Sequence, residues 1–353
     1  MTRQPIPYEA LRQFVASTLT SVGLSPADAD TGATALATTD AWGVFTHGTK
    51  CLAGYLRRLK TGALRPRGVP AVAAQGGAWA VVDGDSSLGH VTSVFAMRVA
   101  MEKARAQGIA YVGVRNSCHF GAAGYYTWLA AREGLIGISM ANDIPSVAAP
   151  GSRGAILGSN PLSYAIPAGR RRPVLLDMST ATVAGGKVYA AKMRGEPIPN
   201  TWLLGPDGRP TTDPSCYPEA GTLTPAAGHK GYGIALLIEA LSGVLTGAEI
   251  TWKVGSWMWD DGQRPTQHGA AFIVIDPRVL TSPEQFGRRM EGLIDEIHAS
   301  PRADGVDRLL VPGELEWETY DRAMRDGIQL PVDVVENVGK AAEIAGVASP
   351  IRS

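Results

Sequence analysis

The feature that most constrains this chain is a regular alternation of short apolar runs with longer helical patterns. The runs span residues 78–82, 109–114 and 135–140, and the helical patterns between them span residues 92–107 and 122–132. Turn residues separate them, such as Asp83-Gly84 and Gly108. Alternation of this kind predicts an α/β fold, in which helices cover the faces of a sheet.

Helical patterns flank this region on both sides. Apolar residues recur at helical spacing from Pro7 to Leu24, Ser25-Pro26 is a typical helix start, and a third helix is expected to end at Gly62. Further strands are expected at 174–176 and 272–275, and further helices at 232–245, 286–297, 315–324 and 334–344. We therefore divide the 353 residues into an N-terminal helical segment (1–75), a central α/β region (76–280) and a C-terminal helical segment (281–353).

Composition excludes several classes of protein. The 33 basic and 33 acidic residues cancel, and no basic face is concentrated enough for a nucleic-acid partner. Cys51, Cys118 and Cys216 cannot all pair and show no CxxC spacing, which favours a reducing compartment. Arg3 and Arg12 interrupt the start of the chain, and no uncharged run is long enough to cross a membrane. We therefore expect a cytoplasmic protein with no membrane partner.

The common functional motifs are absent from the sequence. It contains no GxGxxG, GxxxxGK, HExxH or GxSxG. The motifs therefore give no support for a standard Rossmann dehydrogenase, a P-loop protein, a zincin or a serine hydrolase. Polar and small residues gather instead at the ends of the expected elements, where side chains reach a cleft on a rigid scaffold. These clusters are 46–48, 116–121, 158–161, 177–180, 228–233 and 312–314.

Two histidines are candidates for proton transfer. His119 follows an expected strand and precedes a helix, a position where α/β sheets place ligands, although it could simply cap that helix. His47 lies between Thr46 and Gly48 at the start of the third helix, where it could equally be an ordinary polar residue. We predict no metal site, because no metal-ligand spacing is formed by the remaining histidines, His90, His229, His268 and His298.

Cationic residues next to His47 could hold an anionic substrate. Lys50, Arg57 and Arg58 lie on or near the same helix, and a cation there can bind a carboxylate through charge-assisted hydrogen bonds. Solvated surface charge is the alternative for all three.

Two further clusters suit a phosphate or a ribose. Residues 228–233 are rich in glycine and place Lys230 at the start of a helix, where free amide groups attract anions, although a close-packed turn would look the same. Asp177 ends a strand and leads into Ser179 and Thr180, which either cap a helix or bind hydroxyl groups of a ligand.

Taken in order, these clusters resemble the malate/L-lactate dehydrogenase family, which is distinct from the Rossmann dehydrogenases. The resemblance runs nearly from end to end. Its pieces are Asp40-Ala41-Trp42-Gly43, Thr46-His47-Gly48, residues 117–121, 158–161 and 177–180, Gly185-Gly186-Lys187, Ile198-Pro199, Thr212-Asp213-Pro214, Lys230-Gly231-Tyr232-Gly233 and Pro312-Gly313.

The resemblance implies a non-Rossmann α/β fold in which a mixed sheet is flanked by helices. It implies NADH or NADPH as cofactor (NAD or NADP), bound without a GxGxxG loop by the central region, while residues 1–75 contribute to the substrate site. Members include ureidoglycolate and sulfolactate dehydrogenases, diketogulonate reductase and reductases of cyclic imino acids, which act on small carboxylates. It also implies a homodimer with the active site near the subunit interface.

Site residues follow from the same resemblance. It places the catalytic histidines at His47 and His119, and we take His47 as proton donor and His119 as its partner. With these we group the substrate-binding candidates Thr46, Lys50, Arg57, Arg58 and Asn160, and the cofactor-binding candidates Asp177, Met178, Ser179, Thr180, His229, Lys230, Pro312, Gly313 and Glu314.

Two departures from the family pattern concern the substrate. The family commonly has an Arg three residues after the glycine of its SHG motif, where this chain has Cys51, and Thr46 stands where Ser is usual. We expect hydride transfer between nicotinamide and the α carbon of a small carboxylate, linking α-keto and α-hydroxy acids. Reduction of a cyclic imine on the same fold, or dinucleotide sensing without catalysis, are the alternatives.

Overall fold

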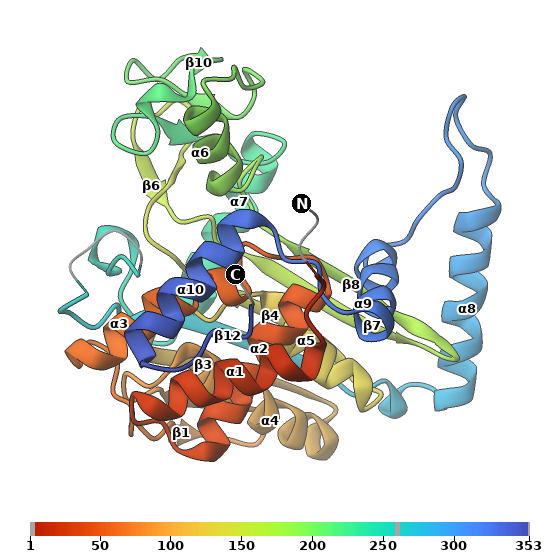
Figure 1. Cartoon of the computed structure of the whole chain (residues 1–353). Helices are drawn as coiled ribbons and strands as arrows, with labels where there is room; N and C mark the ends of the chain where they lie inside the picture. The colour runs from red at the N-terminus through yellow and green to blue at the C-terminus, as the bar shows by residue number, and fades with distance from the viewer. Residues whose placement is uncertain (1–3, 258–261, 352–353) are drawn as a thin grey trace.

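The protein is built around a seven-stranded mixed sheet (Figure 1). A computed structural model describes residues 4–257 and 262–351. The strands lie in the order β1 (Ala71–Gln75), β2 (Trp79–Asp83), β3 (Ile109–Ser117), β12 (His268–Ile275), β4 (Ile136–Ala141), β7 (Leu162–Ala168) and β8 (Arg171–Met178). β12 lies between β3 and β4 and is antiparallel to both, whereas β2 and β3 are parallel. The mixed α/β sheet expected from the alternating pattern is confirmed.

Helices cover both faces of this sheet. α4 (Gly89–Gln107) and α5 (Ala123–Arg132) pack on one face, where Phe272 and Val112 are fully buried. α7 (His229–Glu239) covers the other face through Ile238, and continues as one π-helical turn, η3 (Ala240–Val244). No helix among the described residues is long and apolar enough to cross a membrane.

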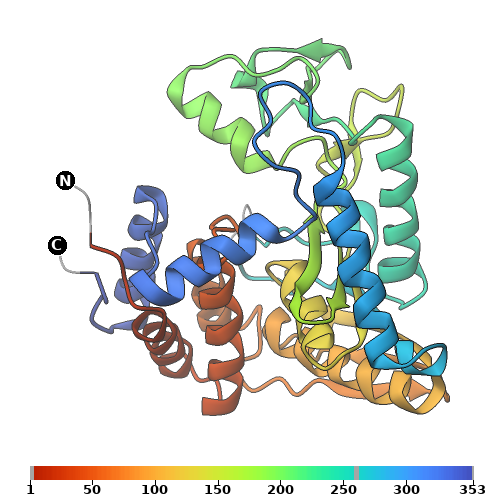
Figure 2. The same cartoon turned by 90° about the vertical axis from the view of Figure 1, so that its right-hand side faces the viewer.

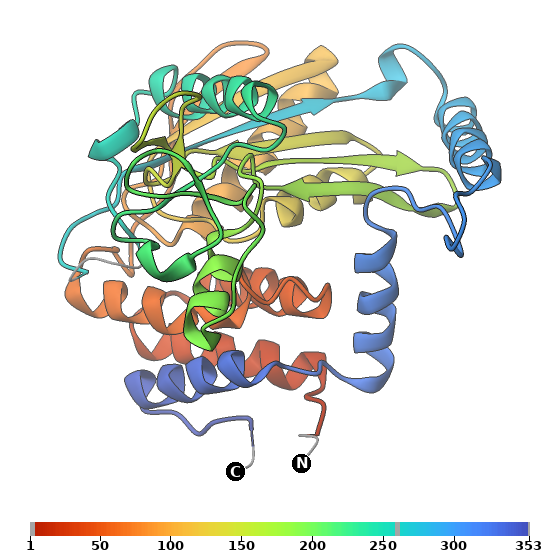
Figure 3. The same cartoon turned by 90° about the horizontal axis from the view of Figure 1, so that it is seen from above.

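The N-terminal helices form a layer of their own beside the sheet (Figure 3). α1 (Tyr8–Ser21), α2 (Pro26–Ala41), the short η1 (Thr49–Cys51) and α3 (Leu52–Thr61) share an apolar core with the C-terminal α10 (Val332–Ala345). The predicted boundaries hold: the Ser25 hydroxyl accepts a hydrogen bond from the Asp28 N–H, and Gly62 ends α3 at φ +86°.

A smaller lobe stands above the main sheet in Figure 1. It holds α6 (Gly185–Arg194) and a second sheet in the order β10 (Pro210–Thr211), β9 (Leu203–Leu204), β11 (Thr222–Leu223), β5 (Val147–Ala148) and β6 (Ala155–Leu157). Strands of two or three residues carry no readable period, so the sequence did not predict this sheet. β7 was also missed, because Pro167 interrupts its apolar run at a register shift.

Two C-terminal helices pack along the β7–β8 edge of the sheet. α8 (Pro283–Ala299) packs against β7, and α9 (Glu314–Asp326) packs against β8 and α2 (Figure 2). Trp317 of α9 donates from its indole N–H to the Pro173 carbonyl at 2.8 Å and meets Trp42 edge-on at 5.7 Å. α9 thereby joins the sheet to the N-terminal layer.

Candidate active site

His47 and His119 meet where the N-terminal layer touches the carboxyl end of β3. His47 lies in the turn between α2 and η1, and His119 follows β3 directly. Their rings stack with centroids 5.6 Å apart. Two segments far apart in the sequence thus contribute one imidazole each to a single site.

His119 is held on two sides by aromatic residues. The Tyr55 hydroxyl of α3 lies 2.6 Å from its Nδ1, which leaves Nε2 for another partner. The Trp257 indole lies flat against the imidazole, with centroids 3.9 Å apart and planes 13° apart. Burial and the neighbouring histidines lower the pKa of His119 well below its ordinary value, so its ring is neutral near pH 7.

His47 has a different electrostatic environment. It is half-buried, and its Nδ1 lies 2.8 Å from the Thr46 hydroxyl. Burial lowers the pKa of His47, while the Asp143 carboxylate acts in the opposite direction. Of the two histidines, His47 is therefore the one whose protonated form has a stabilising carboxylate.

The sequence patterns did not single out Asp143. It follows β4, and its Oδ1 lies 3.0 Å from Nε2 of the buried His268. Its N–H donates to Asn160 Oδ1 at 3.2 Å. The available signal was its position just after an apolar strand, the same kind of position that drew attention to His119.

Asn160 is fully buried and orients its neighbours. Its Nδ2 donates to the Ala235 carbonyl at 3.1 Å and to Glu239 Oε2 at 2.9 Å, while its Oδ1 accepts from Asp143. Because these contacts occupy both ends of its amide, Asn160 links α7 to the Asp143 backbone.

The expected cofactor contacts at 177–180 and at the start of α7 form a strip connected by hydrogen bonds. Asp177 accepts from the Gly124 N–H at 2.7 Å, in the first turn of α5 and five residues after His119. The Thr180 carbonyl accepts from the Ala226 N–H at 2.8 Å, and Ala226 in turn accepts from the Gly231 N–H in the first turn of α7. This strip also contains Met178, Ser179, His229 and the exposed Lys230.

Two of the expected substrate cations are engaged elsewhere. Lys50 pairs with Asp333 of α10 at 2.7 Å. Arg58 is buried and donates to main-chain carbonyls, whereas Arg57 is exposed on α3. Cys51 is buried, and its thiol donates to the Thr46 carbonyl at 3.2 Å.

Pro312, Gly313 and Glu314 lie further along β8. The Pro312 carbonyl accepts from the Leu175 N–H at 2.9 Å, and Gly313 packs so closely on Leu175 that a Cβ would lie 2.9 Å from the Leu175 Cβ. Glu314 accepts from the Val311 N–H at 3.0 Å and lies 3.1 Å from His298 Nε2.

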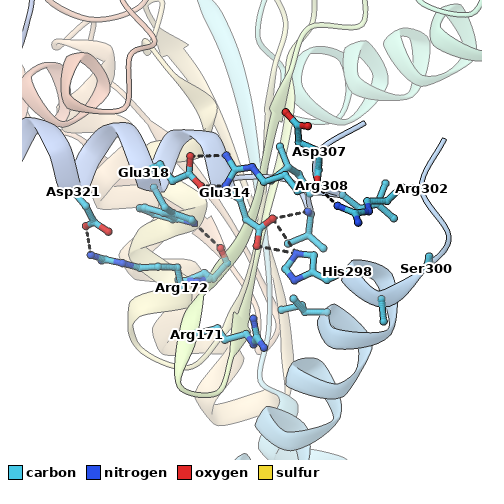
Figure 4. A pocket seen from close by; sticks show the side chains of 17 residues that line it. Arg171, Arg172, His298, Ser300, Arg302, Asp307, Arg308, Glu314, Glu318 and Asp321 are labelled. Carbon is cyan, nitrogen blue, oxygen red and sulfur yellow. Dashed lines mark hydrogen bonds and ion pairs between the residues drawn. The ribbon is translucent and has the colours of Figure 1, made fainter. Parts of the chain in front are cut away.

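Glu314 faces a hollow of about 760 Å³ between α8, α9 and the Arg171 end of β8 (Figure 4). Arg171 lies about 20 Å from Asp177 along β8, at roughly 3.3 Å per residue, so the Arg171 end of this hollow lies well away from Asp177. Its charges balance, because its lining holds four arginines, Arg171, Arg172, Arg302 and Arg308, and four carboxylates, Asp307, Glu314, Glu318 and Asp321.

A buried carboxyl group shapes the turn that carries His47. Asp40 is 1% exposed and accepts from the Thr49 N–H at 3.0 Å and from the Thr49 hydroxyl at 2.5 Å. Gly48 passes so close that a Cβ there would lie 1.9 Å from Asp40 Oδ1, which excludes any other residue without rearrangement. Burial raises the pKa of Asp40 to about 7.

Comparisons with known proteins show the family of this chain. The sequence profile described as malate/L-lactate dehydrogenase matches residues 6–339. The chain belongs to the malate/L-lactate dehydrogenase family. It is 35% identical over 349 residues to a malate dehydrogenase of Pyrococcus abyssi, covering 97% of this chain and 95% of that one.

Two further relatives carry different names within the same family. The chain is 34% identical over 331 residues to the ureidoglycolate dehydrogenase (NAD(+)) of Escherichia coli K12, covering 94% of each. Its fold matches the solved sulfolactate dehydrogenase of Methanocaldococcus jannaschii with a TM-score of 0.89 and 34% identity, covering 98% of each chain. Within residues 4–257 and 262–351, no group of three or more His, Cys, Asp or Glu residues is arranged to hold a metal ion.

Replacing Asp40 with Asn tests the buried carboxyl. The pKa of Asp40 is about 7 in the folded protein, against an ordinary value of 3.8. The folded state therefore holds this proton more tightly than the unfolded state does. The wild type therefore loses stability as the pH rises from about 4 to about 7. Urea denaturation should show that Asp40→Asn gains about 1–3 kcal/mol relative to wild type between pH 5 and pH 8. The exposed Asp304→Asn should show no such trend, and an equal difference at both pH values would contradict the assignment.

Proposed function

We propose that this protein is an NAD(P)-dependent oxidoreductase that transfers hydride between nicotinamide and the α carbon of a small carboxylate substrate. The stacked pair His47 and His119 carries this proposal, because Asp177 bonds to the helix that begins just after His119 and residues 177–180 bond in turn to the segment that starts α7. Two proton-transfer groups and a row of polar groups thus stand on connected segments. When bound, the cofactor supplies the redox chemistry.

The chemistry of the strip suits a dinucleotide. The exposed Asp177 offers a carboxylate and the half-buried Ser179 a hydroxyl of the kind that binds ribose, whereas the Thr180 hydroxyl is fully buried and donates to the Ser159 carbonyl at 3.0 Å. Lys230 stands in the first turn of α7, where the helix dipole attracts phosphate. Gly228 and Gly233 leave open space around the start of this helix, since a Cβ at either would touch nothing within 4 Å. Pro312 and Gly313, which contact Leu175, would extend this binding along β8, whereas Glu314 faces the hollow between α8 and α9.

The two histidines have different roles in proton transfer. His47 is the proton donor to the oxygen of the reduced carbon, because Asp143 favours its charged form and its partial exposure lets it exchange protons with solvent. His119, neutral and oriented by Tyr55, is its partner and helps to position the substrate oxygen. Thr46, whose hydroxyl lies 2.8 Å from His47 Nδ1, would contact the substrate beside that histidine.

The assembly that we propose is a homodimer in the cytoplasm. Leu236 and Leu237 of α7, Val244 of η3 and the next residue, Leu245, are each more than half exposed. Exposed apolar side chains on neighbouring turns favour association with a second copy. The three free cysteines support a reducing compartment.

A C=N bond is a second candidate for the reacting group. Cys51 places a buried neutral thiol where relatives place a guanidinium, and Lys50 is paired with Asp333. We therefore propose a bulkier, less acidic or cyclic substrate, which includes cyclic imino acids. A panel of α-keto acids and cyclic imines, followed through nicotinamide absorbance, tests the oxidoreductase proposal, since a pure sensor would bind cofactor without turnover.

Replacing each histidine with Gln should lower kcat unequally, with losses of about 10²–10⁴-fold for the residue that transfers the proton. Cofactor binding, measured by NADH and NADPH fluorescence titration, should change little. His298→Gln, in the hollow between α8 and α9, is the matched control and should leave kcat unchanged. Wild-type turnover in both His47→Gln and His119→Gln would refute the mechanism.

Lys230→Ala should weaken cofactor binding because it removes a charge-assisted contact with phosphate. A contact worth about 1.5 kcal/mol corresponds to a rise in Kd of roughly tenfold. The exposed Lys340→Ala on α10 controls for loss of a positive charge. An unchanged Kd in a folded Lys230→Ala variant would remove this residue from the site.

Cys51→Arg should shift substrate selection. Wild type is expected to be weak on malate and lactate, and the added guanidinium should raise kcat/KM on them by about tenfold through a bidentate contact with the carboxylate. Cys51→Met, which fills the space without charge, should give no such gain. If wild type already prefers malate or lactate and Cys51→Arg gains nothing, the specificity argument is wrong, while the oxidoreductase proposal stands.

A further inference from the structure

Arg58 is buried in the N-terminal layer, and its guanidinium binds main-chain carbonyls of a segment that is distant in the sequence. It is 3% exposed, and its Nε donates to the Trp257 carbonyl at 3.1 Å and its Nη1 to the Arg264 carbonyl at 3.2 Å. Its Nη2 donates to the Ser256 carbonyl. One guanidinium thus holds both ends of the segment from Ser256 to Arg264.

The same segment is tied down at its base. The Gly255 N–H donates to the Thr266 carbonyl at 2.8 Å, and the Thr266 hydroxyl donates to the Ser117 carbonyl at 3.3 Å, at the end of β3. On the α3 side, the Thr61 hydroxyl donates to the Gly262 carbonyl at 2.5 Å. The described part of the segment is therefore anchored both to α3 and to the strand that leads to His119.

The side chain that this anchoring places is Trp257. Its indole is 7% exposed and lies parallel to the His119 imidazole at 3.9 Å, closer than the other two rings stacked on that histidine, His47 at 5.6 Å and Tyr55 at 6.1 Å. The indole is thus the nearest apolar wall of the imidazole and excludes water from it.

We propose that Arg58 is a positioning residue for the reaction, which holds the Trp257 indole against His119 by binding the carbonyls of Ser256, Trp257 and Arg264. Arg suits this role because its planar fork presents five N–H donors in fixed directions, whereas Lys offers a single, freely rotating ammonium. This positioning role differs from carboxylate binding, which was the expectation for Arg58. The positioning role rests on the proposed function of His119.

Loss of the Arg58 hydrogen bonds should change the pKa of the His119 imidazole. Groups that face His119 are Tyr55 from α3, His90 from α4, His268 from β12 and His47, besides Trp257 itself. Since burial is the main cause of the low pKa of His119, loosening the indole should admit water and raise that pKa toward its ordinary value.

The experiment combines NMR titration with kinetics. Histidine labelled with ¹³C at Cε1 would be titrated in wild type, Arg58→Met, Arg58→Lys, Trp257→Ala and Trp257→Phe, with His119→Gln to assign the signal. Arg58→Met and Trp257→Ala should each raise the His119 pKa by about half a unit or more, while Trp257→Phe, which keeps an aromatic wall, should stay near wild type. Arg58→Lys should fall between wild type and Arg58→Met.

Kinetics then separate positioning from substrate binding. Arg58→Met should lower kcat by about tenfold with KM nearly unchanged, and should cost little more when added to Trp257→Ala, because both act through the same contact. An unchanged His119 titration in Arg58→Met and Trp257→Ala would overturn the proposal. So would a rise in KM that adds fully to the Trp257→Ala effect, which would instead indicate carboxylate binding. The titration needs no turnover, so its result is independent of whether a substrate is found.

Discussion

The hydrogen bond between the Tyr55 hydroxyl and His119 Nδ1 joins the two halves of this site. Tyr55 belongs to the helical layer built from the N-terminal helices and α10, whereas His119 belongs to the loop at the end of β3. At 2.6 Å between two buried side chains, this contact ties the layer to the end of β3 beside the site. His47, carried by the same layer, stacks on the histidine that Tyr55 holds.

The central position of β12 has a similar consequence. This strand arrives late in the chain and lies between β3 and β4, so that the segment before it must cross the carboxyl end of β3. Trp257 and His268, on either side of that crossing, thereby contact His119 and Asp143. A sheet with strands in chain order would have left these residues outside the site.

Patterns in the sequence predicted most of the main elements because they depend on local physics. Helix spacing, the Ser25 cap and the Gly62 stop are properties of neighbouring residues, and the structure confirms them. Predictions were poorer where the pattern is short or interrupted, as in β7 with Pro167 and in the two-residue strands of the second sheet. The contacts of the Lys50 and Arg58 side chains were not predicted either, because their partners come from distant segments.

The sequence by itself determined the α/β class, the helix boundaries at Ser25 and Gly62, and the family, and it singled out the two histidines, since each depends on a local period or an ordered set of motifs. Only the tertiary structure decided that Asp143, Trp257 and Tyr55 surround those histidines, and that Asn160 and Arg58 support that arrangement from within. The reason is physical. A charge or a ring acts through distance and burial, and both are fixed when segments far apart in the chain pack together.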